Sequence, residues 1–159
     1  MHYYTQFDSP LWRIILVGDE VGLTHLHMMT GEGVRCFEIA TTWERNDSHF
    51  ADIKKQIMAY FAGQRTHFDV ELNPQGTVFQ KQVWHALCAI PFGETRSYSD
   101  IAAAIGNPKA SRAVGMANAR NPIPLIVPCH RVIGNNGTLT GFAHGLTAKA
   151  QLLRIEGIH

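Results

Sequence analysis

The sequence predicts an α+β protein in two parts: a small N-terminal sheet with one covering helix, then a mainly helical C-terminal domain. Two observations lead to this prediction. Short apolar runs separated by turn residues come first, over residues 11–40, whereas apolar residues at helical spacing dominate later. Between these regions lies the turn-forming tetrapeptide Asn-Pro-Gln-Gly at residues 73–76. We therefore expect domains at residues 1–73 and 77–159.

The N-terminal region has the pattern of a small sheet. Residues 11–17 and 21–28 are predicted strands joined by a Gly-Asp-Glu turn, and a third strand is expected near residues 34–40. Residues 68–72 are a possible fourth strand.

One helix is expected to cover this sheet. Residues 48–62 carry apolar side chains at helical spacing, with Asp47 or Ser48 as the N-cap and Gly63 at the end.

The C-terminal region begins with a strong helix signal. Thr77 and Gln80 have the spacing of a capping box, and apolar residues follow on one stripe. Cys88 lies beside this stripe, so we expect it to pack in the core. The helix is predicted to end at the Pro-Phe-Gly of residues 91–93.

Two further helices are predicted, at residues 97–105 and 109–118, separated by Gly-Asn-Pro. This arrangement resembles a helix-turn-helix with Lys109 and Arg112 on its second helix. Helical hairpins without any nucleic-acid function have the same local pattern.

Charge is divided unequally along the chain. Residues 1–73 hold six Lys or Arg against ten Asp or Glu, whereas residues 76–159 hold eight against three. A basic C-terminal half fits a polyanionic partner, although a solvated charged face gives the same count. With 45% hydrophobic residues, no signal-peptide pattern and no apolar run near the ~20 residues of a membrane span, a cytoplasmic protein is expected.

The cysteines and histidines do not predict a metal site or a disulfide framework. Cys36, Cys88 and Cys129 are widely separated and form no CxxC pair. His25 and His27 share one face of a predicted strand, but no further ligand follows at a recognisable spacing. We expect reduced thiols and no metal.

The strongest chemical signal is Cys129. It follows the apolar residues 123–128 and precedes His130 and Arg131. A thiolate is the reactive form of cysteine, and a neighbouring base or cation favours it. An inert cysteine that packs as a small apolar residue is the alternative.

Four ordered blocks resemble the O6-alkylguanine-DNA alkyltransferases. They are GETRSY at residues 93–98, GNPKASRAVG at 106–115, NPIP at 121–124 and PCHRVIG at 128–134. The resemblance covers about residues 77–157, while the N-terminal region agrees only in size and coarse pattern. It implies a ribonuclease H-like N-terminal domain.

The resemblance implies a role for five residues in direct reversal of DNA damage. Cys129 accepts the alkyl group, His130 is the general base through a water, and Glu156 orients His130. Asn121 braces the turn, and Tyr98 donates to the departing guanine.

The resemblance also implies the substrate pocket and the DNA contacts. The pocket consists of Val132, Phe142, Ala143 and His144. Some relatives carry a tyrosine and a serine in place of Phe142 and Ala143, so here only the backbone amide of residue 143 is expected to contact the base.

Arg112 is expected to fill the gap that a flipped nucleotide leaves, from a helix in the minor groove. The remaining residues expected at DNA are Ser111, Ala113, Ala117, Lys109, Arg120 and Arg131.

The implied protein is a monomer without cofactor that acts once on alkylated double-stranded DNA. The alternatives are a DNA-binding module without transfer, such as a helix-turn-helix regulator, and a thiol hydrolase. The non-transferring relatives lack the cysteine, and no oxyanion hole for a hydrolase is evident.

Overall fold

The structure is a computed structural model that describes residues 1–33 and 37–158. Its N-terminal part is a sheet of order β3-β2-β1-β4. Strands β1 (Tyr3–Asp8), β2 (Arg13–Gly18) and β3 (Leu23–Met29) are antiparallel neighbours, and the short β4 (Glu44–Arg45) pairs in parallel with β1. The predicted α+β class is confirmed.

The central strand β2 is buried on both faces. Ile14 and Leu16 belong to the main core, whereas Ile15 and Val17 pair with His27 and His25 on the opposite face. Rings of Phe37 and Trp43 lie against these two histidines. The prediction that the two histidines share a face of the strand is confirmed, and that face packs against aromatic rings.

The strand predictions were correct for β2 and β3 and wrong elsewhere. β1 was missed because its many polar residues obscure the alternation of buried and partly exposed side chains along the strand. Of the strand expected near residues 34–40, the first three residues lie outside the described ones and the rest form no strand. Residues 68–72 contribute a single bridge, between Leu72 and Leu23, rather than a strand.

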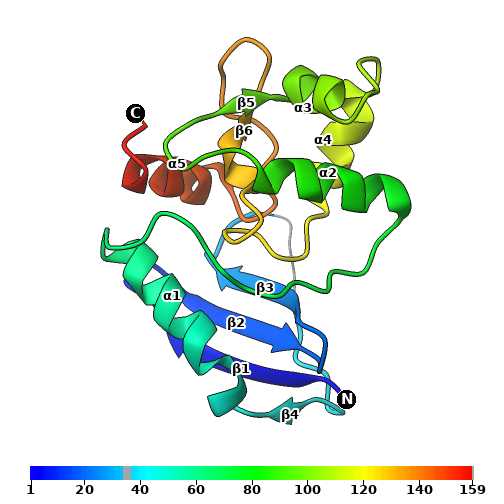
Figure 1. Ribbon diagram of the computed structural model, residues 1–159. Coiled ribbons are helices and arrows are strands. Elements are labelled where there is room, and N and C mark those ends of the chain that lie inside the picture. Colours follow the sequence, from blue (N-terminus) through cyan, green and yellow to red (C-terminus); the bar gives the residue numbers. More distant parts are fainter. Residues whose placement is uncertain (34–36, 159) are drawn as a thin grey trace.

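Helix α1 (Ala51–Phe61), preceded by the 3-10 turn η1 (Ser48–Phe50), covers the sheet as predicted (Figure 1). Gly63 follows it with φ of +74°, a conformation that favours glycine. Asp47 occupies the N-cap position of η1, one of the two positions expected, but its carboxylate accepts hydrogen bonds from Thr5 and Arg45 and does not cap the helix. The Asn46 side chain accepts the His49 amide in its place.

Three helices build the next layer: α2 (Val78–Cys88), α3 (Tyr98–Ala104) and α4 (Ser111–Ala119). The predicted capping box at Thr77 and Gln80 is present. A second one joins Ser97 to Asp100 at the start of α3. Both side chains satisfy amides that a helix N-terminus leaves without partners.

The chain then forms the 3-10 turn η2 (Cys129–Arg131), strand β6 (Val132–Ile133) and helix α5 (Leu146–Ile155). β6 pairs in parallel with β5 (Arg96–Ser97), so the start of α3 lies beside the strand that leaves Cys129.

Figure 1 shows α2 to α5 gathered on one side of the molecule, with the linker after α1 running between them and the sheet. One apolar core runs through both parts. Across the junction the Leu26 amide donates to the Pro122 carbonyl, and within the N-terminal part the Asn73 amide donates to the Leu23 carbonyl. Within the described residues, no helix has the length and apolar character needed to cross a membrane.

Candidate active site

The side chain of Asn121 forms hydrogen bonds to the backbone of the turn that leads to Cys129. Its side-chain amide donates to the Val127 carbonyl at 2.8 Å, and its carbonyl accepts the Ile123 amide at 3.0 Å. Leu125 within this turn has φ of +76°, which a residue with a Cβ rarely adopts. Asn121 therefore braces the backbone that positions Cys129, whose own exposure is only 4%.

His130 and Glu156 form a buried pair. His130 Nε2 lies 2.7 Å from Glu156 Oε2, and neither side chain is exposed. Glu156 caps the C-terminal end of α5, more than twenty residues further along the chain. The pairing expected from the resemblance is thus present.

Three other groups converge on Glu156, and sequence reasoning missed them. Arg131 donates to both carboxylate oxygens, at 2.8 and 3.1 Å. Tyr60 of α1 donates from its hydroxyl at 2.6 Å, and the Gly93 amide donates at 3.2 Å. Burial acts to raise the pKa of Glu156, but the bonds from His130, Arg131 and Tyr60 outweigh it and lower the pKa to about 2. Glu156 is therefore ionised.

The position of Arg131 corrects a prediction. It was expected at a DNA phosphate, but its guanidinium is buried, paired with Glu156 and bonded to the Ile90 carbonyl at 2.7 Å. A charge that is already paired inside the protein is not available at the DNA surface.

The surroundings of His130 determine its protonation state. Burial lowers the pKa of His130, against the opposing effect of Glu156, so the ring is neutral near pH 7. Because ionised Glu156 can only accept, the hydrogen-bond network assigns the proton to Nε2. Nδ1 then carries a lone pair, and no hydrogen-bond partner for it is found among residues 1–33 and 37–158.

Lys149 is a second residue that the sequence reasoning missed. It lies on α5 with its side chain fully buried and its ammonium bonded to the carbonyls of Val132 and Thr140. Burial lowers its pKa to about 8, and the negative charge of the Cys129 thiolate acts in the opposite direction. The charges of Lys149 and Cys129 therefore influence each other. No local pattern marks it, since a lysine on a helix is usually exposed.

Tyr98 points to the loop between β6 and α5. Its hydroxyl lies 3.3 Å from both the carbonyl and the hydroxyl of Thr140, and its ring faces Gly115 of α4. Tyr98 and Lys149 thus share the Thr140 carbonyl.

Three of the predicted pocket residues lie in this loop, and the fourth, Val132, lies in β6 just before it. Val132, Phe142 and His144 are buried, and Ala143 is partly buried. His144 is bonded to His27 of the sheet at 3.3 Å, a contact that the sequence did not predict.

Helices α3 and α4 pack as a helical hairpin, with α4 also against α2. Lys109, Arg112, Ala113 and Arg120 are exposed there, and Ser111 is partly exposed. Ala117 is a correction, because it is 3% exposed and its carbonyl accepts the Trp84 indole at 2.9 Å. It packs inward against α2 and cannot approach DNA.

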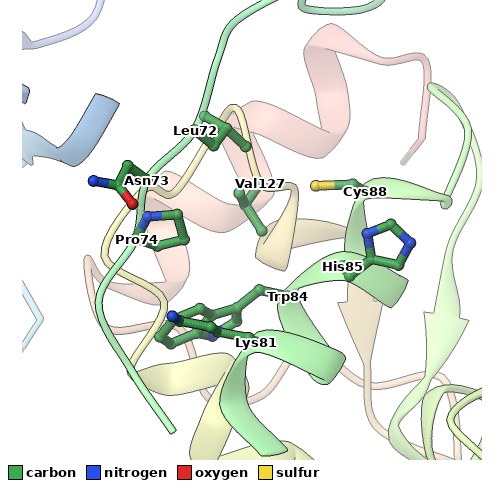
Figure 2. Close-up of a pocket in the computed structure, with 8 residues that line it drawn as sticks. All are labelled: Leu72, Asn73, Pro74, Lys81, Trp84, His85, Cys88 and Val127. Atoms are coloured by element: carbon green, nitrogen blue, oxygen red, sulfur yellow. The ribbon is translucent and has the colours of Figure 1, made fainter. Parts of the chain in front are cut away.

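A separate cavity of about 310 Å³ lies beside α2 (Figure 2). It is lined by Leu72, Asn73, Pro74, Lys81, Trp84, His85, Cys88 and Val127. Cys88, expected in the core, is instead exposed at this cavity. None of the predicted site residues lines it. Elsewhere, residues 1–33 and 37–158 contain no group of three or more His, Cys, Asp or Glu side chains placed to hold a metal ion.

Fold and site together define a class: proteins that combine a helical hairpin with a buried cysteine whose neighbour in sequence is a histidine paired with a buried carboxylate. Sequence models identify the member of that class. The DNA-binding domain of 6-O-methylguanine DNA methyltransferase matches residues 78–158, and the ribonuclease-like domain of the same family matches residues 2–74. The chain belongs to this family, and so to the DNA repair methyltransferases. The resemblance noted from the sequence is confirmed.

Individual relatives agree with this over nearly the whole chain. A methylated-DNA–protein-cysteine methyltransferase of Methanosarcina acetivorans is 56% identical, with 98% of each chain covered. The constitutive one of Bacillus subtilis is 48% identical, with 99% of this chain and 97% of the relative covered. The crystal structure of Mycobacterium tuberculosis OGT in complex with DNA has a TM-score of 0.88 at 49% identity, covering 97% and 92% of the two chains.

Proposed function

We propose that this protein repairs O6-alkylguanine, and also O4-alkylthymine, in double-stranded DNA by moving the alkyl group irreversibly to its own Cys129. The observation that carries the proposal is the His130 ring, which is bound to Glu156 through Nε2 and leaves a lone pair on Nδ1. That arrangement leaves Nδ1 able to accept a proton, as a base for the thiol of the neighbouring residue requires.

The transfer is a single displacement at carbon. The Cys129 thiol gives its proton through a water to His130 Nδ1, and ionised Glu156 stabilises the resulting imidazolium. The sulfur then forms a bond to the alkyl carbon as the bond from that carbon to guanine O6 breaks. The electron pair of the broken bond returns to guanine, which takes up a proton from water on its ring, while the imidazolium releases the former thiol proton to water. Lys149 favours the thiolate through its charge.

The departing base needs a hydrogen-bond donor, and Tyr98 is the candidate. Its hydroxyl already lies at the loop between β6 and α5, near Thr140. The pocket formed by Val132, Phe142, Ala143 and His144 offers apolar surface and the amide of residue 143.

The nucleotide must leave the base stack to reach a thiol that is 4% exposed. We assign the extruding role to Arg112, at the exposed start of α4. Lys109 and Arg120 flank it as phosphate contacts, while Ser111 and Ala113 are small enough for close approach in the minor groove. The hydrogen-bonding groups in that groove hardly differ between base pairs, which suits a repair protein that must act at any sequence.

Each molecule acts once, as a monomer. The product is a thioether on Cys129, which has no leaving-group chemistry at neutral pH. Residues 77–159 act as the domain that binds DNA and accepts the alkyl group, and residues 1–73 as the domain that supports it.

The test is incubation with duplex DNA that contains one O6-methylguanine, followed by intact mass measurement of the protein. The expected result is one added methyl group per molecule, absent in Cys129→Ala and present in Cys88→Ala. Cys88 is a suitable control because it is an exposed thiol outside the site.

Each rival predicts a different result. A DNA-binding module without transfer binds the DNA and keeps its original mass. A thiol hydrolase turns over repeatedly without accumulating methylated protein. Either outcome rejects the proposal.

A further inference from the structure

The residues that follow β3 lie against the loop and helix that complete the candidate site. Thr30 donates from its hydroxyl to the His144 carbonyl at 2.6 Å, and Glu32 accepts the Thr147 amide at 2.9 Å. Residues 30–33 thus join the N-terminal sheet to the start of α5. Nothing in the sequence motifs of the C-terminal region indicates this contact.

The Glu32 contact compensates for a missing cap. Helix α5 begins after Gly145, which has no side chain to accept the first free amides, and the helix has no side-chain cap of its own. The Glu32 carboxylate occupies that position from another part of the chain. A negative charge also interacts favourably with the positive end of the helix dipole. The helix stabilised in this way carries Lys149 and Glu156.

The approach is close enough to require glycine on both sides. Gly33 has φ of +85°, and a methyl group there would overlap the Ala143 carbonyl oxygen and crowd the Gly145 amide. Gly145 has φ of +101°, and a methyl group there would overlap the Glu32 side chain. The two backbones therefore pack directly against each other.

The contacted loop is the one that holds the candidate pocket residues Phe142, Ala143 and His144. On its other side, Tyr98 and Lys149 bind the Thr140 carbonyl. Tyr98 and Lys149 thus bind the loop at Thr140, whereas residues 30–33 bind it at its C-terminal end, at His144.

We infer that Thr30, Glu32 and Gly33 form a positioning element, which sets the shape of the alkylated-base pocket by capping α5 and fixing residues 143–145. This inference rests on the proposed function. It gives the N-terminal domain a role in the rate of transfer and in the size of alkyl group accepted, separate from DNA affinity.

The glycines supply a matched pair of variants. Gly31 and Gly33 both have positive φ, but a methyl group on Gly31 meets nothing within 4 Å. Gly31→Ala therefore has comparable backbone strain without the overlap at the pocket loop. Glu32→Ala removes the cap without adding any atoms, so it tests the same element even where Gly33→Ala does not fold.

The experiment measures single-turnover transfer at saturating methylated DNA, the Kd for that DNA, and the reaction with free O6-methylguanine and free O6-benzylguanine. Gly33→Ala and Glu32→Ala are expected to lower the maximal rate by on the order of tenfold. They are also expected to change the ratio of the two free-base reactions. The Kd stays within about twofold, because the DNA-facing helices are untouched, and Gly31→Ala resembles wild type.

The inference is overturned where Gly33→Ala and Glu32→Ala transfer at the wild-type rate, or where the loss appears only in Kd. An equal loss in Gly31→Ala also overturns it, since strain alone then explains the effect. Failure of the wild-type protein to accept any methyl group is a different result, and it rejects the proposed function instead.

Discussion

Tyr60 of α1 donates a 2.6 Å hydrogen bond to Glu156, the carboxylate that also holds His130. The two residues are 96 positions apart in the chain, and both are buried. The helix that covers the N-terminal sheet therefore reaches the residue that orients the candidate base. The two parts of the molecule share this polar cluster as well as a core.

Removing the Tyr60 hydroxyl should lower the stability of the protein more than the rate of methyl transfer. In Tyr60→Phe, Glu156 loses one donor but keeps His130 and Arg131, so we expect the free energy of unfolding to fall by about 1–2 kcal/mol. The rate of methyl transfer should fall by less than about tenfold. Urea unfolding and single-turnover kinetics measure the two effects. A large loss of rate with unchanged stability contradicts this expectation.

Acid should remove the contribution of Glu156 to the stability of the folded protein. Its pKa lies at about 2 in the folded protein against an ordinary 4.5, so its contribution to stability is fully present above pH 4.5. It is lost as the pH falls through the folded value, and the shift corresponds to about 3 kcal/mol. The lowered pKa of His130 adds a loss in the same direction, starting below its usual 6.5.

Unfolding at a series of pH values in wild type and Glu156→Gln checks this. The variant should be less stable at pH 7, and the difference should narrow as the pH falls below about 4.5. Exposed Glu71→Gln is the control and should follow wild type throughout. Parallel curves for wild type and Glu156→Gln are the contrary result.

Lys149 should control the reactivity of Cys129. Lys149→Met keeps the apolar stem and removes the charge, so methyl transfer at pH 7 should slow by about tenfold or more. The difference from wild type should shrink as the pH rises past about 8, because wild-type Lys149 then loses its own proton. Iodoacetamide labelling of Cys129 against pH follows the thiolate directly. A constant ratio between the two proteins at all pH values indicates a purely structural lysine.

Arg112 should matter only for duplex DNA. Arg112→Ala should slow transfer from a methylated duplex by at least about tenfold, because flipping costs a few kcal/mol. The reaction with free O6-benzylguanine should be unchanged, since no stack has to be opened. Arg154→Ala removes another exposed arginine, at the end of α5, and serves as the control. Equal losses with both substrates are inconsistent with an extruding role.

Local signals predicted the elements whose stability is itself local. The capping box at Thr77, the glycine after α1 and the turns around α3 and α4 depend on neighbours within four residues, and they are present as expected. β1 was missed because its burial depends on its pairing with β2 and not on its own composition.

The order of motifs in the chain indicated the family. Cys129 and His130 were predicted because they lie within one recognisable block, and Glu156 was predicted from the resemblance near the C-terminus. Only the tertiary structure decided what surrounds them. It turned Arg131 inward to Glu156, buried Lys149 near Cys129, brought Tyr60 to the carboxylate and laid residues 30–33 on α5. These contacts join segments far apart in sequence, and their energies come from burial and charge pairing, which exist only once the chain has folded.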